Sequence, residues 1–184
     1  MYRSKNIILV SHCMLNYNSK VENTSAALDV CKEIILRLLE LNIGIIQLPC
    51  PELCQLGIKR WGHVREQLDT PFFRKRCRDL FEPYVEQMQN YIENGYNLMG
   101  IVGINGSPSC GVEFSCSGTG WGGEFADLAA VGRTVAAAKL CSSKGIFIEE
   151  IEKLLDGKAL PIKIVGIDEG DTAFSIKQLE ILTT

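Results

Sequence analysis

The sequence predicts one three-layer α/β/α domain, residues 1–184, built on a short and mainly parallel sheet. Short apolar runs alternate along the chain with amphipathic helical segments, a pattern typical of a parallel sheet covered on both faces. The length of 184 residues suits a single domain, and no linker or repeat divides it. Hydrophobic residues make up 46% and charged residues 22%, as in an ordinary globular protein.

In the first half of the chain, a β-branched run at 6–11 predicts a strand buried on both faces. Apolar residues three to four positions apart predict a helix at 26–41, and a second apolar run predicts a strand at 43–48. The segment 52–70 has no period and is expected to be irregular. Pro71 opens a helical pattern that ends at Glu93, and Pro83 within it predicts a kink or a break.

In the second half, the apolar run at 98–104 predicts a third strand, followed by a glycine-rich loop at 105–123. Helical patterns then cover 124–142 and 146–155. A fourth strand is expected at 162–167, and the remainder, 172–184, is expected to be a helix.

Charge and hydropathy exclude several function classes. The net charge of −3 and pI near 5.5 offer no basic surface for nucleic acid or an anionic membrane. No apolar run approaches the roughly 18 residues that span a bilayer, and the run near the amino end is too short for a signal peptide. We therefore expect a cytoplasmic protein in a reducing compartment, where cysteines serve as metal ligands or catalysts rather than disulfides.

Three of the eight cysteines follow predicted strands: Cys13, Cys50 and Cys110. Because ligands bind at the carboxyl ends of parallel strands, these thiols are expected to meet at one edge of the sheet. Three thiolates suit a soft metal centre such as iron–sulfur, zinc or copper(I). Three ligands from separate loops also leave one coordination position open, as a reacting centre requires.

The positions of the other five cysteines indicate a functional role less strongly. Cys31, Cys77 and Cys141 lie in predicted helices and are expected to be structural. Cys54 and Cys116 stay open as a fourth ligand, which would close the centre and make it structural or electron-transferring.

The motifs around these three cysteines, taken in order, resemble the thiouracil desulfurase family, formerly a domain family of unknown function. They are Cys13 after the first strand, Cys50-Pro51-Glu52 after the second and Ser107-Pro108-Ser109-Cys110-Gly111 after the third. The resemblance implies that Cys13, Cys50 and Cys110 hold a [4Fe–4S] cluster whose remaining iron binds the sulfur of a small thiolated substrate, such as a thiouracil-type nucleobase. It implies a desulfurase, or desulfidase, in which water replaces sulfur without net redox chemistry. Departures at 14–20, 57–62 and 104–106 predict a divergent subgroup.

Four polar residues beside the cysteines are the candidates for the remaining chemistry. Glu52 is expected to act as general acid or base. Ser107 and Ser109 are expected to donate to substrate or cluster, or else to stabilise their turn. Asn105 can bind a ring carbonyl and amide through its two-sided side chain.

Two alternative functions remain open at this point. One is a non-catalytic iron–sulfur or metal-binding module with a fourth cysteine ligand. The other is a metal-free cysteine enzyme with Cys110 as nucleophile and His12 as base. Two further segments have candidate roles: 118–123 as a glycine-rich lid, and the loop of Arg60, Trp61, His63 and Arg65 as a grip on an anionic or aromatic substrate.

Overall fold

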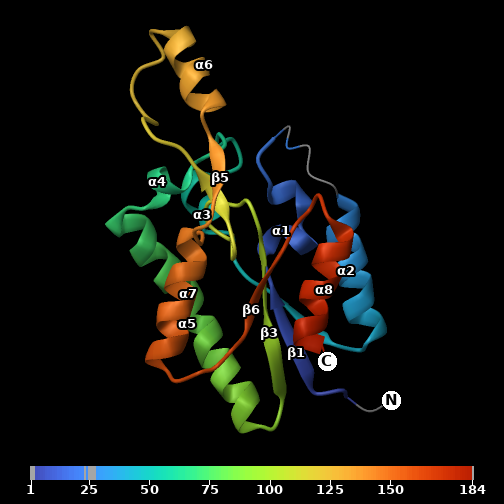
Figure 1. The fold of residues 1–184 in the computed structure, drawn as a ribbon. Coiled ribbons are helices and arrows are strands. Elements are labelled where there is room, and N and C mark those ends of the chain that lie inside the picture. The colour runs from blue at the N-terminus through green and yellow to red at the C-terminus, as the bar shows by residue number, and fades with distance from the viewer. Residues whose placement is uncertain (1–2, 23, 25–27, 184) are drawn as a thin grey trace.

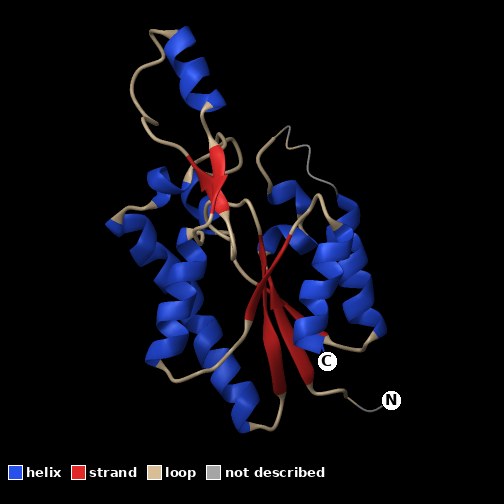
Figure 2. Cartoon of the chain, viewed as in Figure 1, coloured by secondary structure: helices blue, strands red, loops and turns tan. Residues whose placement is uncertain are grey.

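A four-stranded parallel sheet forms the centre of the molecule, in a computed structural model that describes residues 3–22, 24 and 28–183. The strand order is β2-β1-β3-β6, and every neighbouring pair is parallel (Figure 2). The strands are β1 (Asn6–Val10), β2 (Gly44–Gln47), β3 (Asn97–Ile104) and β6 (Ile164–Ile167). The predicted α/β fold with a mainly parallel sheet is therefore confirmed.

Two pairs of helices cover the two faces of this sheet (Figure 1). One face carries α2 (Leu28–Glu40) and α8 (Thr172–Thr183); the other carries α5 (Pro71–Glu93) and α7 (Ile146–Gly157). Side chains of a strand point alternately to its two faces, so β1 sends Ile8 and Val10 into the first core and Leu9 into the second. The continuous apolar runs in the sequence reflect this burial on both sides.

The structure differs from the sequence prediction mainly in the connections. The segment expected to be irregular contains α3 (Pro51–Leu56) and α4 (Arg65–Leu68), and α1 (His12–Leu15) with a 3₁₀ turn (Tyr17–Ser19) follows β1. These helices are too short to show an apolar period. Of the two outcomes predicted at Pro83, a kink or a break, the break is wrong, because α5 is a single helix whose buried face continues across the proline from Phe81 to Val85. The start of the helix predicted at 26–41 lies partly outside the described residues.

A projecting arm replaces most of the helix predicted at 124–142. It contains β4 (Ser115–Ser117), α6 (Leu128–Ala136) and β5 (Lys139–Cys141), with β4 and β5 paired antiparallel. Figure 1 shows α6 standing away from the sheet, and none of the residues of α6 is buried. Cys141 therefore lies in a strand rather than in a helix as predicted, because its backbone pairs with Ser115 across the ribbon.

A network of charged side chains joins α7 to α5, and its centre is Glu150. The Glu150 side chain is 1% exposed and contacts Arg74 at 2.7 Å, Arg78 at 2.5 Å and Lys153 at 2.7 Å. Burial opposes its ionisation, yet the contacts with Lys153, Arg78 and Arg74 lower the pKa of Glu150 to about 2. The carboxylate is therefore charged at neutral pH.

Replacing Glu150 with glutamine is expected to lower the free energy of unfolding at pH 7 by about 3 kcal/mol, because three basic groups lose their buried counter-charge. Urea denaturation measures the change. A depressed pKa stabilises the folded state above the unfolded value of about 4.3, and this contribution is lost as pH falls toward the folded value. The difference between the wild type and Glu150→Gln should therefore shrink between about pH 4 and pH 2. A difference that grows with acidification contradicts the assignment.

Asp79→Asn is the matched control for this experiment. Asp79 pairs with Lys75 at 2.8 Å on the exposed side of α5. Exposed ion pairs of this kind contribute little to stability. No measurable change is therefore expected from the control.

None of the helices in the described ranges combines the length and apolarity needed to cross a bilayer.

Candidate functional site

The three cysteines predicted to act together follow the carboxyl ends of three neighbouring strands. Cys13 lies in α1 just after β1, Cys50 is the N-cap of α3 after β2, and Cys110 lies in the loop that follows β3. Cys110 is buried, whereas Cys13 and Cys50 are partly exposed. Ionisation of Cys50 or Cys13 would raise the pKa of Cys110, so both thiols lie within electrostatic reach of Cys110.

Hydrogen bonds between the cysteine loops hold this arrangement in place. Gln47 Nε2 donates to the His12 carbonyl oxygen at 2.7 Å, and the His12 ring contacts the Leu48 carbonyl at 3.3 Å. These contacts join the Cys13 and Cys50 loops. The Ser109 hydroxyl donates to Glu52 Oε1 at 2.5 Å and joins the Cys50 and Cys110 loops. The His12 side chain is thus part of the scaffold. Its ring nitrogens contact the Leu48 carbonyl oxygen and the Asn16 side chain, rather than Cys110.

Burial strongly disfavours the charged form of all three thiols. Burial raises the pKa of Cys13 to about 12, and the positive charge of Lys20 only partly opposes it. Burial likewise raises the pKa of Cys50, and it raises the pKa of Cys110 further with the help of the charges on Cys50 and Cys13. Reactive cysteines have lowered pKa values, so these thiols are poor free nucleophiles. A bound cation would stabilise all three thiolates at once.

The loop that carries Cys110 is fixed by the amino end of α7. Gly145 N donates to the Gly111 carbonyl oxygen at 2.9 Å, and Phe147 N donates to that of Ser109 at 2.9 Å. A Cβ atom at Gly145 would lie 2.3 Å from the carbonyl carbon of Ser109. Inside the loop, the Ser107 hydroxyl accepts a hydrogen bond from Cys110 N at 3.0 Å. Ser107 therefore stabilises the turn, one of the two roles expected for it.

Glu52 occupies a buried position between the Cys50 and Cys110 loops. Its Oε1 accepts a hydrogen bond from the Ser109 hydroxyl. Its other carboxylate oxygen, Oε2, lies 3.6 Å from Arg60 Nε. The charge of Glu52 acts on both Cys50 and Cys110. Sequence reasoning placed Arg60 in a loop that grips substrate. The structure instead buries its side chain against Glu52, with 4% exposed.

Asn105 at the end of β3 uses one side of its amide for structure. Its Oδ1 accepts hydrogen bonds from Val112 N and Glu113 N, both at 3.1 Å. Its Nδ2 is buried and has no hydrogen-bond partner among the described residues. Because Oδ1 is occupied, only the donor side of Asn105 is left for a ligand, and an unpaired buried donor favours a ligand acceptor.

The surroundings of Cys13 contain residues that sequence reasoning did not select. Lys20 and Glu169 form a largely buried ion pair, with side-chain exposures of 11% and 13%. The buried Cys31 donates its thiol hydrogen to Glu169 at 3.4 Å. Glu169 follows β6 and Lys20 follows β1, so only the parallel pairing of the strands brings them together. No sequence signal of spacing could have found this contact.

The two cysteines left open as a fourth ligand lie in other surroundings. Cys54 is exposed. Cys116 lies in β4, where the neighbouring charges that raise its pKa, after burial, are those of Cys141 and Glu66. The thiols that act most strongly on Cys110 are those of Cys50 and Cys13, rather than Cys54 or Cys116.

The donor set can be tested against the expected cofactor. In the described part of the chain, no three or more His, Cys, Asp or Glu side chains gather as a single metal ion requires. In a [4Fe–4S] cluster each cysteine binds a different iron, so the sulfur atoms need not meet at one point. Thiolates are soft ligands of the kind that iron–sulfur centres use, and the Glu52 carboxylate lies close to two of the three thiols.

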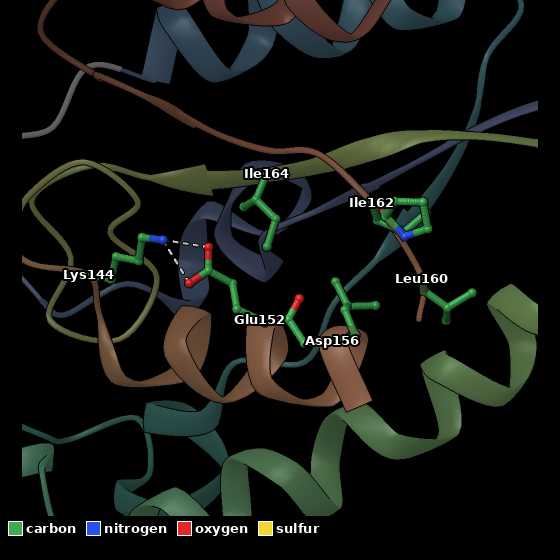
Figure 3. A pocket seen from close by; sticks show the side chains of 8 residues that line it. Lys144, Glu152, Asp156, Leu160, Ile162 and Ile164 are labelled. Carbon is green, nitrogen blue, oxygen red and sulfur yellow. Dashed lines mark hydrogen bonds and ion pairs between the residues drawn. The ribbon is translucent and has the colours of Figure 1, made fainter. Parts of the chain in front are cut away.

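Two cavities lie outside this set of residues. One, of about 370 Å³, is lined by Lys144, Glu152 and Asp156 together with apolar residues of α7 and the segment leading into β6 (Figure 3). Lys144 and Glu152 form an ion pair at its edge. The other, of about 280 Å³, lies between α4 and the segment 118–121 at the base of the arm. Neither cavity is lined by a residue of the predicted site.

Comparison with known proteins finds an archaeal relative. The chain is 41% identical over 110 residues to "Uncharacterized protein MJ0003" of Methanocaldococcus jannaschii, a match that covers 60% of this chain and 70% of the relative. No family model and no solved structure matches the chain.

Proposed function

We propose a function from the site itself, because the chain belongs to the same family as the archaeal protein MJ0003, whose name states no activity. The proposed function is a [4Fe–4S]-dependent desulfidase that removes sulfur from a small thiolated compound, such as a thiouracil-type nucleobase. The observation that carries the proposal is the set of three buried or half-buried thiols at adjacent strand ends, with Glu52 hydrogen-bonded between two of their loops.

Cys13, Cys50 and Cys110 would hold the cluster. Its contribution when bound is Lewis acidity toward the substrate sulfur, since three protein ligands leave one iron open. The raised pKa values of these thiols support a metal-bound role over the metal-free cysteine enzyme. The base expected in that alternative, His12, has its ring in contact with the Leu48 carbonyl oxygen and Asn16 rather than with Cys110.

The overall reaction converts C=S and water into C=O and hydrogen sulfide, with no net change of oxidation state. Glu52 is buried beside the thiols and is the group that can take and return the protons of water. Ser109 fixes the orientation of the Glu52 carboxylate through Oε1 and leaves Oε2 for proton transfer. The unpaired Nδ2 of Asn105 can donate to an oxygen or nitrogen acceptor of the substrate.

The direct test is sulfide release from 2-thiouracil by protein purified and reconstituted without oxygen. We expect sulfide and uracil in equal amounts, and no requirement for an added reductant. Glu52→Gln keeps the size of the side chain and should lower kcat by about 10²-fold or more, while the iron content stays unchanged. Iron-loaded protein that releases no sulfide from any thiolated substrate would favour the non-catalytic metal-binding module.

A further inference from the structure

Arg60 contains a buried hydrogen-bond donor that no described residue satisfies. Its Nη2 donates to the Ser19 carbonyl oxygen at 2.7 Å, and its Nη1 donates to that of Gly57 at 3.1 Å. Its Nε is buried and has no hydrogen-bond partner within the described ranges, although the side chain is only 4% exposed. Leaving a charged donor unpaired in the interior is costly, so this nitrogen favours a bound acceptor.

The atom that faces Arg60 Nε is Glu52 Oε2. The two atoms are 3.6 Å apart, which is too long for a direct hydrogen bond. At this separation a water molecule that bonds to both atoms can replace the direct hydrogen bond. The other carboxylate oxygen is already occupied by the Ser109 hydroxyl at 2.5 Å, so Oε2 is the oxygen available to such a water.

The protein holds both partners of this gap rigidly. Two backbone carbonyls, one on each side of the site, fix the Arg60 guanidinium: Ser19 follows the Cys13 loop and Gly57 follows α3. The Ser109 hydroxyl fixes the Glu52 carboxylate from the Cys110 loop. Arg60 and Glu52 therefore face each other at the junction of all three cysteine loops, where a reacting water would be needed.

We propose that Arg60 and Glu52 together bind the water molecule that replaces sulfur on the substrate, with Arg60 as a positioning residue. This inference rests on the proposed desulfidase function. The Nε–H group donates to the water oxygen, and the water donates one hydrogen to Glu52 Oε2. One lone pair of the water is then free to attack the carbon that carries sulfur.

The bonds balance in this step. The water lone pair forms the C–O bond as one water proton passes to Oε2 and the π electron pair of the C=S bond moves onto sulfur. The σ electron pair of the C–S bond leaves with sulfur when a lone pair of the new oxygen forms the carbonyl. The proton on Oε2 then returns to the departing sulfur. The remaining hydroxyl proton also passes to sulfur as the carbonyl forms, so the products are C=O and hydrogen sulfide. No oxidant or reductant is needed.

The first test is a high-resolution crystal structure of the wild-type protein, which does not depend on activity. We expect an ordered water within about 3 Å of both Arg60 Nε and Glu52 Oε2. In Arg60→Met the same water should be absent. A direct bond between Nε and Oε2 with no water between them in the wild type overturns the proposal, whether or not the variant folds.

The second test separates positioning from a structural role. In the reconstituted enzyme, Arg60→Met should lower kcat about 10²-fold and leave KM nearly unchanged, because the water rather than the substrate is displaced. Arg37→Met is the matched control: Arg37 forms an exposed ion pair with Glu180 at 3.4 Å and should keep full kcat. An unchanged kcat in Arg60→Met also overturns the proposal. If the water is present but no thiolated compound releases sulfide, the desulfidase function fails, and with it the role of this water.

Discussion

Replacing Cys110 with serine is expected to abolish assembly of the iron–sulfur centre. Cys110 is buried, and the neighbouring Ser109 bonds to Glu52 in the Cys50 loop, so the Cys110 loop is held against another loop of the ligand set. A serine oxygen is a harder ligand than a thiolate and binds iron–sulfur clusters poorly. Cys13→Ser and Cys50→Ser should have the same effect. The measurements are bound iron and the absorbance at about 400 nm after anaerobic reconstitution.

Cys54→Ala and Cys116→Ala are the matched controls for these variants. Cys54 is exposed on α3, and Cys116 lies in the ribbon of β4 and β5, so both should keep the iron and the absorbance of the wild type. Loss of the cluster in Cys116→Ala would show a fourth ligand and favour the non-catalytic module. Retention of four irons in Cys110→Ser would contradict the proposed ligand set.

Gly145→Ala is expected to disrupt the site from the far side of the Cys110 loop. The new Cβ would lie 2.3 Å from the Ser109 carbonyl carbon and 2.7 Å from Cys110 N, distances at which backbone atoms must move. The amino end of α7 would be pushed away from the loop carbonyls that it caps. Because a displacement of about 1 Å at a reacting centre can cost 10²-fold in rate, we expect at least that loss in sulfide release.

The control for this variant lies at the other end of the same helix. A Cβ at Gly157 meets nothing within 4 Å. Gly157→Ala should therefore keep full activity and raise stability by up to about 1 kcal/mol, because alanine favours the helix. Cluster content, activity and thermal denaturation of both variants give the comparison. Equal activity in Gly145→Ala and the wild type would show that the loop does not depend on its contact with α7.

The tertiary contacts explain why the site is built from loops that are far apart in sequence. Each cysteine follows a strand, and parallel pairing sets the ends of β1, β2 and β3 side by side. Hydrogen bonds of Glu52, Ser109 and Arg60 then join these loops, although the bonded residues are dozens of positions apart in the sequence. A centre held in this way can be preorganised before any ligand binds.

The sheet, the four helices that cover it and the positions of Cys13, Cys50 and Cys110 at strand ends could all be predicted from the sequence. These features depend on local periodicity and on continuous apolar runs, which are properties of short windows of sequence. The short helices α1, α3 and α4 were not predictable, because four to six residues cannot display a period. The ribbon of β4 and β5 was also missed, since its pairing joins segments more than twenty residues apart.

The polar side chains that meet around the thiols could not be predicted from the sequence and are known from the fold. Asn105 looked like a two-sided ligand for a substrate, but Val112 and Glu113 occupy its oxygen. Arg60 was expected to bind substrate from a loop, but the fold buries it beside Glu52. The physical reason is that burial and hydrogen-bond partners depend on elements brought together by packing, whereas strand and helix formation depends on neighbours along the chain.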